Sequence, residues 1–127
     1  MMTANAPEQL EWSGKNGAEE RFFCMTAEPG ASFEEELHSL MTRYRNLGGG
    51  EEDEFLLRFH VSDSVRQSAA LRRMIGERNS YVSMVGQPPA NGARVALEAW
   101  HIGGMLGKRH MAEQGGTVVE ALRAHYR

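Results

Sequence analysis

The stretch that decides the fold is EFLLRFHVSDSVRQSAALRRMI, residues 54–75. Its first eight residues place apolar side chains on both alternating faces, which is typical of a strand that lies inside a sheet and is covered on both sides. Ser64 and Gln67 then match a capping box, the pattern that begins a helix, and Gly76 follows the helical part. An inner strand that leads directly into a helix predicts a domain in which helices pack on a sheet.

Alternation within this strand divides its side chains between two faces. One face is expected to hold Phe55, Leu57, Phe59 and Val61, and the other Leu56, Arg58 and His60. The first face is fully apolar and should therefore contact the helices. The second carries a cation and an imidazole, so we expect it to be the open face of the sheet.

A second helix is predicted to begin after Ser32. Ser32 and Glu35 form a capping box, and residues 34–36 place three glutamates in the first turn, where negative charge is favoured. The glycines at 48–50 end the helix. Its apolar positions recur at helical spacing: Phe33, Leu37, Leu40, Met41, Tyr44 and Leu47.

Further strands are predicted at residues 9–15, 20–27, 80–85 and 94–102, the first two joined into a hairpin by the turn at 15–17. The order β-β-α-β-α-β-β predicts an α+β fold: one mixed sheet with both helices on one face. Residues 1–102 are expected to form the domain. Residues 103–127 are glycine-rich at first and are expected to be a linker and a C-terminal extension.

Composition is that of a soluble globular chain of one domain: 127 residues, 41% hydrophobic and 24% charged. A net charge of −3 argues against nucleic-acid and membrane partners, because neither would meet a basic surface. The single cysteine, Cys24, cannot form an internal disulfide, which suits a reducing compartment. The first 11 residues lack the features of a signal peptide, and no apolar stretch reaches the roughly 20 residues that cross a bilayer. We therefore expect a cytoplasmic protein.

Two runs of sequence resemble the Rid superfamily (YjgF, also labelled endoribonuclease L-PSP-like): FHVSD at 59–63 and VGQPPANGARVALEAW at 85–100. The Gly-Gln-Pro-Pro loop before the last strand is also similar to the Rid-like part of chorismatases. The resemblance covers residues 22–102. It implies the chorismate mutase-like (Rid) fold, a homotrimer, and clefts between subunits that bind a small-molecule ligand on the sheet face opposite the helices. No cofactor is expected.

Imine-hydrolysing members of the superfamily hold the substrate carboxylate with an arginine that begins the fourth strand. They place a water with a glutamate in a Glu-x-Glu-Ala-like run on the last strand. Here the run reads ALEA at 96–99, so Glu98 is retained and the first carboxylate is replaced by alanine. The arginine position aligns with Asn79 or Ser80, and Arg78 matches only if the proline-containing loop is treated as longer than usual. The resemblance therefore implies an imine deaminase with an incomplete catalytic motif.

Arg58, His60 and Glu98 form the main candidate catalytic site. If their two strands lie in one sheet, all three side chains point to the open face. A guanidinium, an imidazole and a carboxylate placed there can bind an anionic ligand and position a water. The alternative is a paired polar network that allows this face to be buried between subunits.

Four other residues are predicted to bind the ligand. Tyr81 and Trp100 are expected to stack on a planar ligand, or else to pack in a subunit interface. Arg78 and Arg94 are expected to hold a carboxylate at the cleft mouth, or else to be solvated surface charges. Cys24 is expected to be buried and inert. No metal site is expected, because the histidines lack ligand spacing with Cys24 or carboxylates.

Two functions remain open from the sequence. The first is a Rid-type deaminase or hydrolase acting on a carboxylate-bearing metabolite at intersubunit clefts. The second is a non-catalytic ligand-binding or structural trimer, which the missing first carboxylate favours. A ribonuclease or a translation-associated factor ranks last, because phosphate binding depends on clustered Lys and Arg, and this acidic chain has no basic stripe.

Overall fold

The structure is a computed structural model that describes residues 9–13, 19–50 and 53–103. The predicted turn at 15–17, residues 51–52 and nearly all of the predicted linker and C-terminal extension (104–127) lie outside the described residues. None of the described helices is long and apolar enough to cross a membrane.

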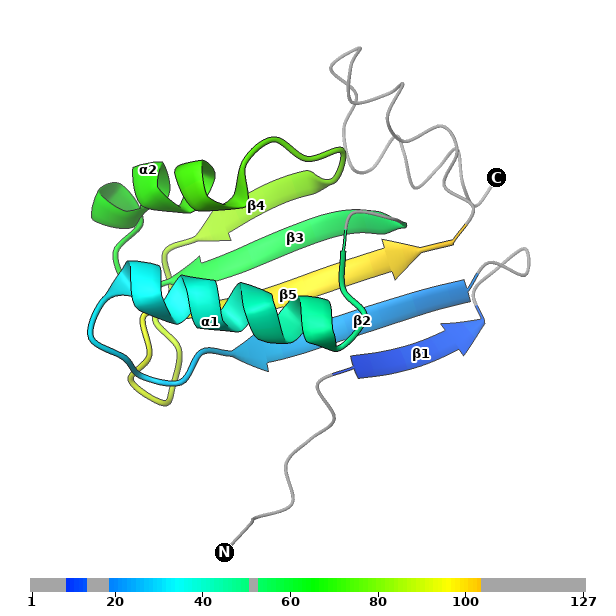
Figure 1. The fold of residues 1–127 in the computed structure, drawn as a ribbon, viewed down its shortest axis with the longest axis horizontal. Coiled ribbons are helices and arrows are strands. Elements are labelled where there is room, and N and C mark those ends of the chain that lie inside the picture. Colours follow the sequence, from blue (N-terminus) through cyan, green and yellow to red (C-terminus); the bar gives the residue numbers. More distant parts are fainter. Residues whose placement is uncertain (1–8, 14–18, 51–52, 104–127) are drawn as a thin grey trace, which may run out of the picture.

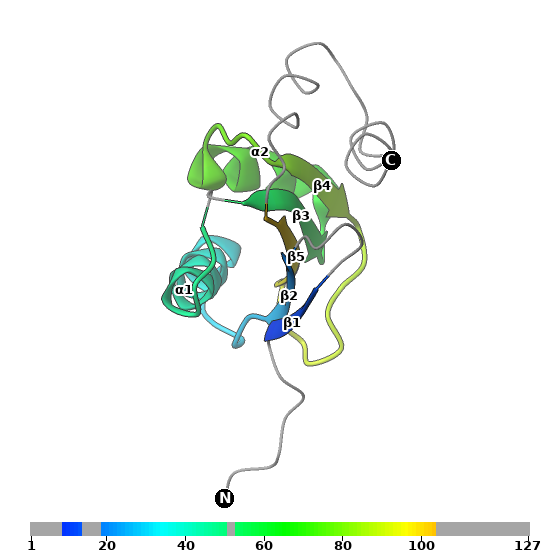
Figure 2. The same ribbon diagram turned by 90° about the vertical axis from the view of Figure 1, so that its right-hand side faces the viewer.

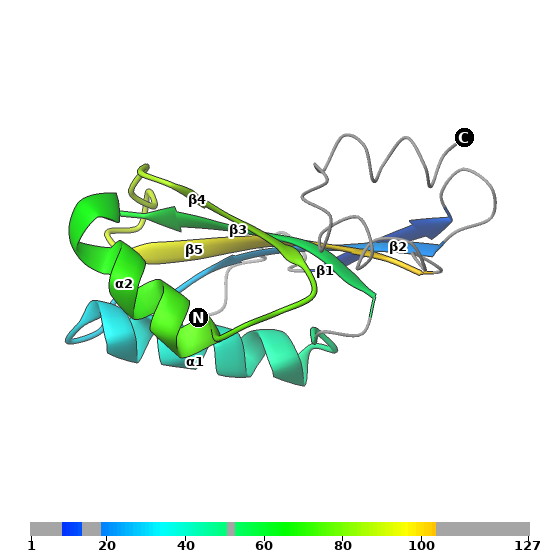
Figure 3. The ribbon, with the colours of Figure 1, turned by 90° about the horizontal axis from the view of Figure 1, so that it is seen from above.

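The described strands form one mixed sheet in the order β1-β2-β5-β3-β4 (Figure 1). The strands are β1 (Gln9–Ser13), β2 (Glu19–Thr26), β3 (Glu54–Val61), β4 (Tyr81–Val85) and β5 (Val95–Ile102), and the helices are α1 (Phe33–Asn46) and α2 (Ser64–Ile75). Neighbouring strands are antiparallel except β3 and β4, which are parallel and connected through α2. Both helices lie on the same face of the sheet (Figures 2 and 3). The α+β class, with a mixed sheet and two helices, is confirmed.

The hydrophobic core lies between this face and the helices. Its centre is β5, where Val95, Leu97 and Ala99 are buried in alternation with the side chains of the other face. Leu57 and Phe59 of the inner strand β3 are also fully buried. Each fully buried Leu or Phe stabilises the fold by about 1.5–3 kcal/mol. The other core residues are Phe23, Met25 and Ala27 from β2 and the segment after it, Phe33, Leu37, Leu40, Met41 and Tyr44 from α1, Val61 from β3, Leu71 from α2, and Ala93.

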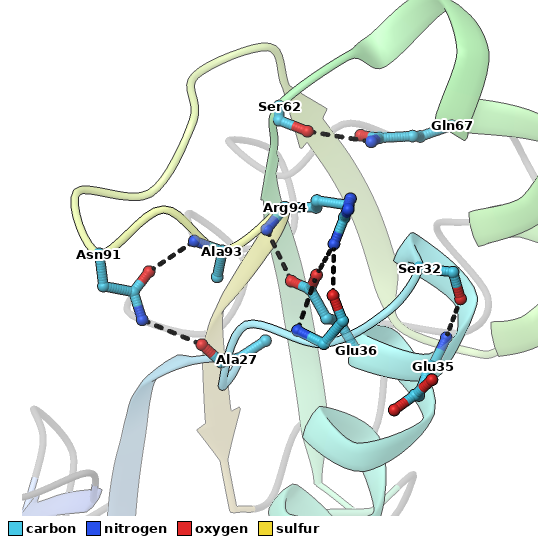
Figure 4. A network of polar contacts seen from close by, with 10 residues as sticks. Ala27, Ser32, Glu35, Glu36, Ser62, Gln67, Asn91, Ala93 and Arg94 are labelled. Atoms are coloured by element: carbon cyan, nitrogen blue, oxygen red, sulfur yellow. Dashed lines mark hydrogen bonds and ion pairs between the residues drawn. The ribbon is translucent and has the colours of Figure 1, made fainter.

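Helix α1 begins and ends where its sequence signals predict. The Glu35 backbone N–H donates to Ser32 Oγ at 3.1 Å, which caps the N-terminus (Figure 4). At the C-terminus, Gly48 has a φ of 99°, a conformation that favours glycine. A Cβ on Gly49 would lie 2.2 Å from the Tyr44 ring, so this position also requires glycine. The glycine run thus allows the chain to leave the helix closely against Tyr44.

The N-cap of α2 differs from the prediction by one residue. Asp63, and not Ser64, caps the helix: its side chain accepts from the Arg66 backbone N–H at 3.2 Å. Gln67 completes the cap by accepting from the Asp63 backbone N–H at 2.9 Å. The prediction missed this because aspartate caps a helix as well as serine does, and the two stand side by side in the sequence.

A second difference concerns Phe55. The pairing of β3 with β5 shifts register between Glu54 and Leu56, which is a β-bulge. Phe55 therefore lies with the aromatic side chains of the open face, where its ring contacts Tyr81 and Trp100 at centroid distances of 5.5 and 5.4 Å. The prediction that Phe55 faces the helices was wrong, because the extra residue of a bulge breaks the alternation of side chains.

Candidate functional site

The sheet face opposite the helices carries its side chains in rows that run across the strands. One row, here called the charged row, consists of Cys24 (β2), Glu98 (β5), Arg58 (β3) and Ser83 (β4). The next row lies two residues away on each strand and is here called the aromatic row: Phe22, Trp100, Leu56 and Tyr81. Since a strand rises about 3.3–3.4 Å per residue, the two rows are about 6.6–6.8 Å apart.

The predicted catalytic residues meet in the charged row and beside it. His60 Nε2 and Glu98 Oε1 are joined by a short hydrogen bond. Arg58 lies directly opposite Glu98 on the neighbouring strand and is exposed. Its guanidinium makes no hydrogen bond or ion pair with the residues that the structure describes. Because Glu98 bonds to His60 instead, the guanidinium remains available to an anionic ligand.

A cleft of about 240 Å³ opens between the two rows. Arg58, Glu98 and Trp100, all predicted as site residues, line it, together with Ala99. Its remaining lining residues are Phe22 and Leu56, which sequence reasoning did not identify. Alternation along β2 could have placed Phe22 on one face, but only the pairing of β2 with β5, which are distant in the chain, brings it beside Trp100.

Trp100 is held in place on several sides. Its indole Nε1–H donates to Glu20 Oε1 at 2.9 Å. The Phe22 ring is stacked against it, with centroids 5.1 Å apart and planes inclined by 20°. The Phe55 ring meets it edge-on, and Tyr81 in turn contacts Phe55. Tyr81 and Trp100 therefore belong to one aromatic cluster, but of the two only Trp100 lines the cleft.

Arg78 lies outside the cleft, in a buried ion pair with Glu54. Its Nε donates to Glu54 Oε1 at 2.8 Å and its Nη2 to Oε2 at 3.1 Å, while only 11% of its side chain is exposed. Glu54 also accepts from Ser80 Oγ and from the Tyr44 hydroxyl, both at 2.6 Å. Arg78, predicted to bind the ligand, is therefore not among the residues that line the cleft, and the alternative that it is a solvated surface charge was wrong.

These contacts extend into a chain of buried hydrogen bonds. Because the Tyr44 hydroxyl donates to Glu54, its oxygen accepts from His101 Nε2–H at 2.5 Å, and His101 Nδ1 then accepts from Arg21 Nη2 at 3.3 Å. Burial alone would raise the pKa of Glu54, but the hydrogen bonds from Arg78, Ser80 and Tyr44 outweigh it and lower this pKa. Burial, together with the Glu54 charge, raises the pKa of Tyr44. Glu54 is therefore charged and Tyr44 neutral.

Arg94 occupies the other end of β5 and contacts α1 (Figure 4). Its guanidinium pairs with Glu36 and donates to the Gly30 carbonyl at 2.9 Å, and its backbone N–H donates to Glu36 Oε1 at 2.7 Å. Burial would raise the pKa of Glu36, but the hydrogen bonds from Arg94 and Gly30 lower it. Arg94 thus connects the start of β5 to the first turn of α1 through hydrogen bonds and an ion pair. It is not among the residues that line the cleft.

Cys24 is exposed, so the expectation that it is buried was wrong. It lies in the charged row beside Glu98. Partial desolvation of the thiol and the negative charge of Glu98 raise the pKa of Cys24, which keeps the thiol protonated and a poor nucleophile. Among the described residues, no group of three or more His, Cys, Asp or Glu side chains is placed to hold a metal ion.

No protein-family model and no curated protein matches the chain.

Proposed function

We propose that the open face binds a small carboxylate-bearing metabolite and hydrolyses 2-imino acids to 2-oxo acids and ammonia, as Rid-type deaminases do. One observation carries the proposal. The exposed guanidinium of Arg58 stands opposite the hydrogen-bonded pair of Glu98 and His60, and the cleft is lined by both Arg58 and Glu98.

The chemistry follows from this arrangement. Arg58 binds the substrate carboxylate through two parallel hydrogen bonds, for which a guanidinium is the best-suited side chain. Directly opposed residues of neighbouring antiparallel strands have Cβ atoms about 4.5–5.5 Å apart. The imine carbon next to the bound carboxylate thus comes within reach of a water on Glu98.

The proposed reaction has two steps. The water oxygen bonds to the imine carbon while Glu98, held by His60, accepts the water proton. This proton then passes to the imine nitrogen, which gives a 2-amino-2-hydroxy acid. In the second step the hydroxyl proton of this intermediate moves through Glu98 to the amino nitrogen, the C–N bond breaks as the carbonyl forms, and ammonia leaves with the 2-oxo acid as the second product.

The test is hydrolysis of a freshly generated 2-imino acid, scored against the uncatalysed rate. Replacing Arg58 by glutamine is expected to lower kcat/KM about 10- to 100-fold, mainly through KM, because a hydrogen bond to a charged group contributes about 1.5–3 kcal/mol. Arg66→Gln is the matched control, since Arg66 is an exposed arginine of α2 with only a 3.6 Å contact to Asp63. Absence of any acceleration at high protein concentration would rule the activity out.

The proposed assembly is a cytoplasmic homotrimer in which a neighbouring subunit completes each cleft, as the resemblance to the Rid superfamily implies. Light scattering is expected to give about three times the chain mass of 14.2 kDa. A mass of one chain would reject the trimer, and would leave a cleft formed by a single subunit.

A non-catalytic binding protein is the second candidate. Ala96 stands opposite His60 on the open face, at the position where the imine-hydrolysing members carry their first carboxylate. Binding of a 2-oxo acid that Arg58→Gln abolishes, with no hydrolysis of the corresponding imine, would identify this function.

A further inference from the structure

We infer that the cleft selects ligands whose carboxylate is attached to an apolar, planar side chain, of the kind found in 3-aryl-2-oxo and 3-aryl-2-imino acids. This inference rests on the proposed function, because it takes Arg58 as the carboxylate-binding residue. The observation behind it is that one wall of the cleft consists of three members of the aromatic row, and the other of two members of the charged row: Phe22, Leu56 and Trp100, and Arg58 and Glu98.

The described side chains of the aromatic wall, Phe22, Leu56 and Trp100, present apolar surface to the cleft. Their one polar atom, the indole nitrogen of Trp100, donates to Glu20, which is itself buried. Phe22 and Leu56 supply the rest of the wall. A short polar ligand would leave this surface hydrated, whereas a flat hydrocarbon group would displace the water and pack against it.

The spacing of the rows sets the length of the ligand. The backbone position of Arg58 lies about 6.6–6.8 Å from the aromatic row, measured along the strands. An apolar group must extend a comparable distance from the carboxylate to reach the wall, which a phenyl ring on a three-carbon acid does and a methyl group does not. A cleft of about 240 Å³ suits a small metabolite.

The charges in the cleft allow one carboxylate. Among the described residues that line the cleft, Arg58 is the only cationic side chain, and Glu98 is its neighbour in the charged row. A second ligand carboxylate would face Glu98 or the apolar wall, and either position is unfavourable for an anion. Dicarboxylates are therefore disfavoured.

The experiment is calorimetric titration of the whole protein with phenylpyruvate, pyruvate and 2-oxoglutarate, which are stable products of the proposed reaction. Phenylpyruvate is expected to bind about tenfold or more tightly than either of the others, since a single extra methylene in an apolar pocket is worth about tenfold or more. It is also expected to slow alkylation of Cys24, the sole cysteine, which is exposed in the charged row.

Phe22→Leu is expected to bring the affinities for phenylpyruvate and pyruvate within about threefold of each other, because it removes a ring from the wall. Tyr81→Leu is the control. Tyr81 belongs to the aromatic row but is not among the residues that line the cleft, so this variant is expected to bind phenylpyruvate more tightly than pyruvate, as the wild type does. Equal affinities in the wild type, or a preference that persists in Phe22→Leu, would overturn the inference and leave the proposed function standing. Binding of none of the three acids would overturn both.

Discussion

Replacement of Glu54 by glutamine is expected to lower the free energy of unfolding by about 3–5 kcal/mol, the usual cost of removing one partner from a buried ion pair. The Glu54 side chain is fully buried and accepts from Arg78, Ser80 and Tyr44. A glutamine has one acceptor oxygen in place of two, and its NH₂ group would face donors. Arg78 would also remain largely buried without a counter-charge. Urea denaturation of the two proteins measures the difference.

Glu54→Gln is also expected to change how the free energy of unfolding depends on pH in the acid range. The folded-state pKa of Glu54 is lowered, so its contribution to stability is present above the unfolded-state pKa of about 4.3 and is lost as pH falls through the folded-state value. Glu36 has a lowered pKa as well and acts in the same direction. Wild-type stability should therefore fall below about pH 4, and it should fall less steeply in Glu54→Gln.

Glu77→Gln is the matched control, because Glu77 is an exposed carboxylate next to Arg78 in the chain and should change stability by less than about 0.5 kcal/mol. Adding Arg78→Leu to Glu54→Gln should recover much of the loss, since it removes the unpaired guanidinium. The ion pair of Glu54 and Arg78 does not stabilise the fold if Glu54→Gln has the wild-type urea midpoint and if its free energy of unfolding falls at acid pH as that of the wild type does.

Local signals in the sequence were sufficient for much of the fold. The capping serine of α1, its glycine stop and the apolar alternation of β3 each act within a few residues, and the structure contains all three near the expected positions. The face on which Phe55 lies could not be derived in this way. A bulge is a property of how two strands pair, and the partner of β3 here is β5, at the far end of the domain.

In the candidate site, too, local sequence was sufficient for some residues, whereas the roles of others depend on partners far away in the chain. Arg58, His60 and Glu98 were brought together correctly, because alternation in two strands of one sheet is enough to align them. The roles of Arg78 and Arg94 depend on carboxylates that lie 24 and 58 residues away in the chain, respectively. Nothing local distinguishes an arginine that will meet a buried glutamate from one that will meet solvent or a ligand.

Glu98→Gln is expected to lower kcat for imine hydrolysis about 10²- to 10⁴-fold, the range by which a positioned general base accelerates a reaction. Glutamine has nearly the shape of glutamate, and its amide oxygen can still accept a hydrogen bond from His60. The substitution thus keeps the contact while removing the group that takes the water proton. Steady-state kinetics, with circular dichroism and mass as checks on folding and assembly, measure the effect, and Glu77→Gln again serves as the control.

Arg58→Gln and Glu98→Gln, the two variants of the charged row, should therefore affect different kinetic constants. Arg58→Gln weakens binding and raises KM, whereas Glu98→Gln should leave the affinity for phenylpyruvate unchanged or slightly higher, because it removes a negative charge beside the bound carboxylate. An unchanged kcat in Glu98→Gln would remove Glu98 from the mechanism even if the protein proves to be a deaminase. A loss of both kcat and phenylpyruvate affinity would instead make Glu98 a residue that shapes the cleft, with the base to be sought in His60, its hydrogen-bond partner.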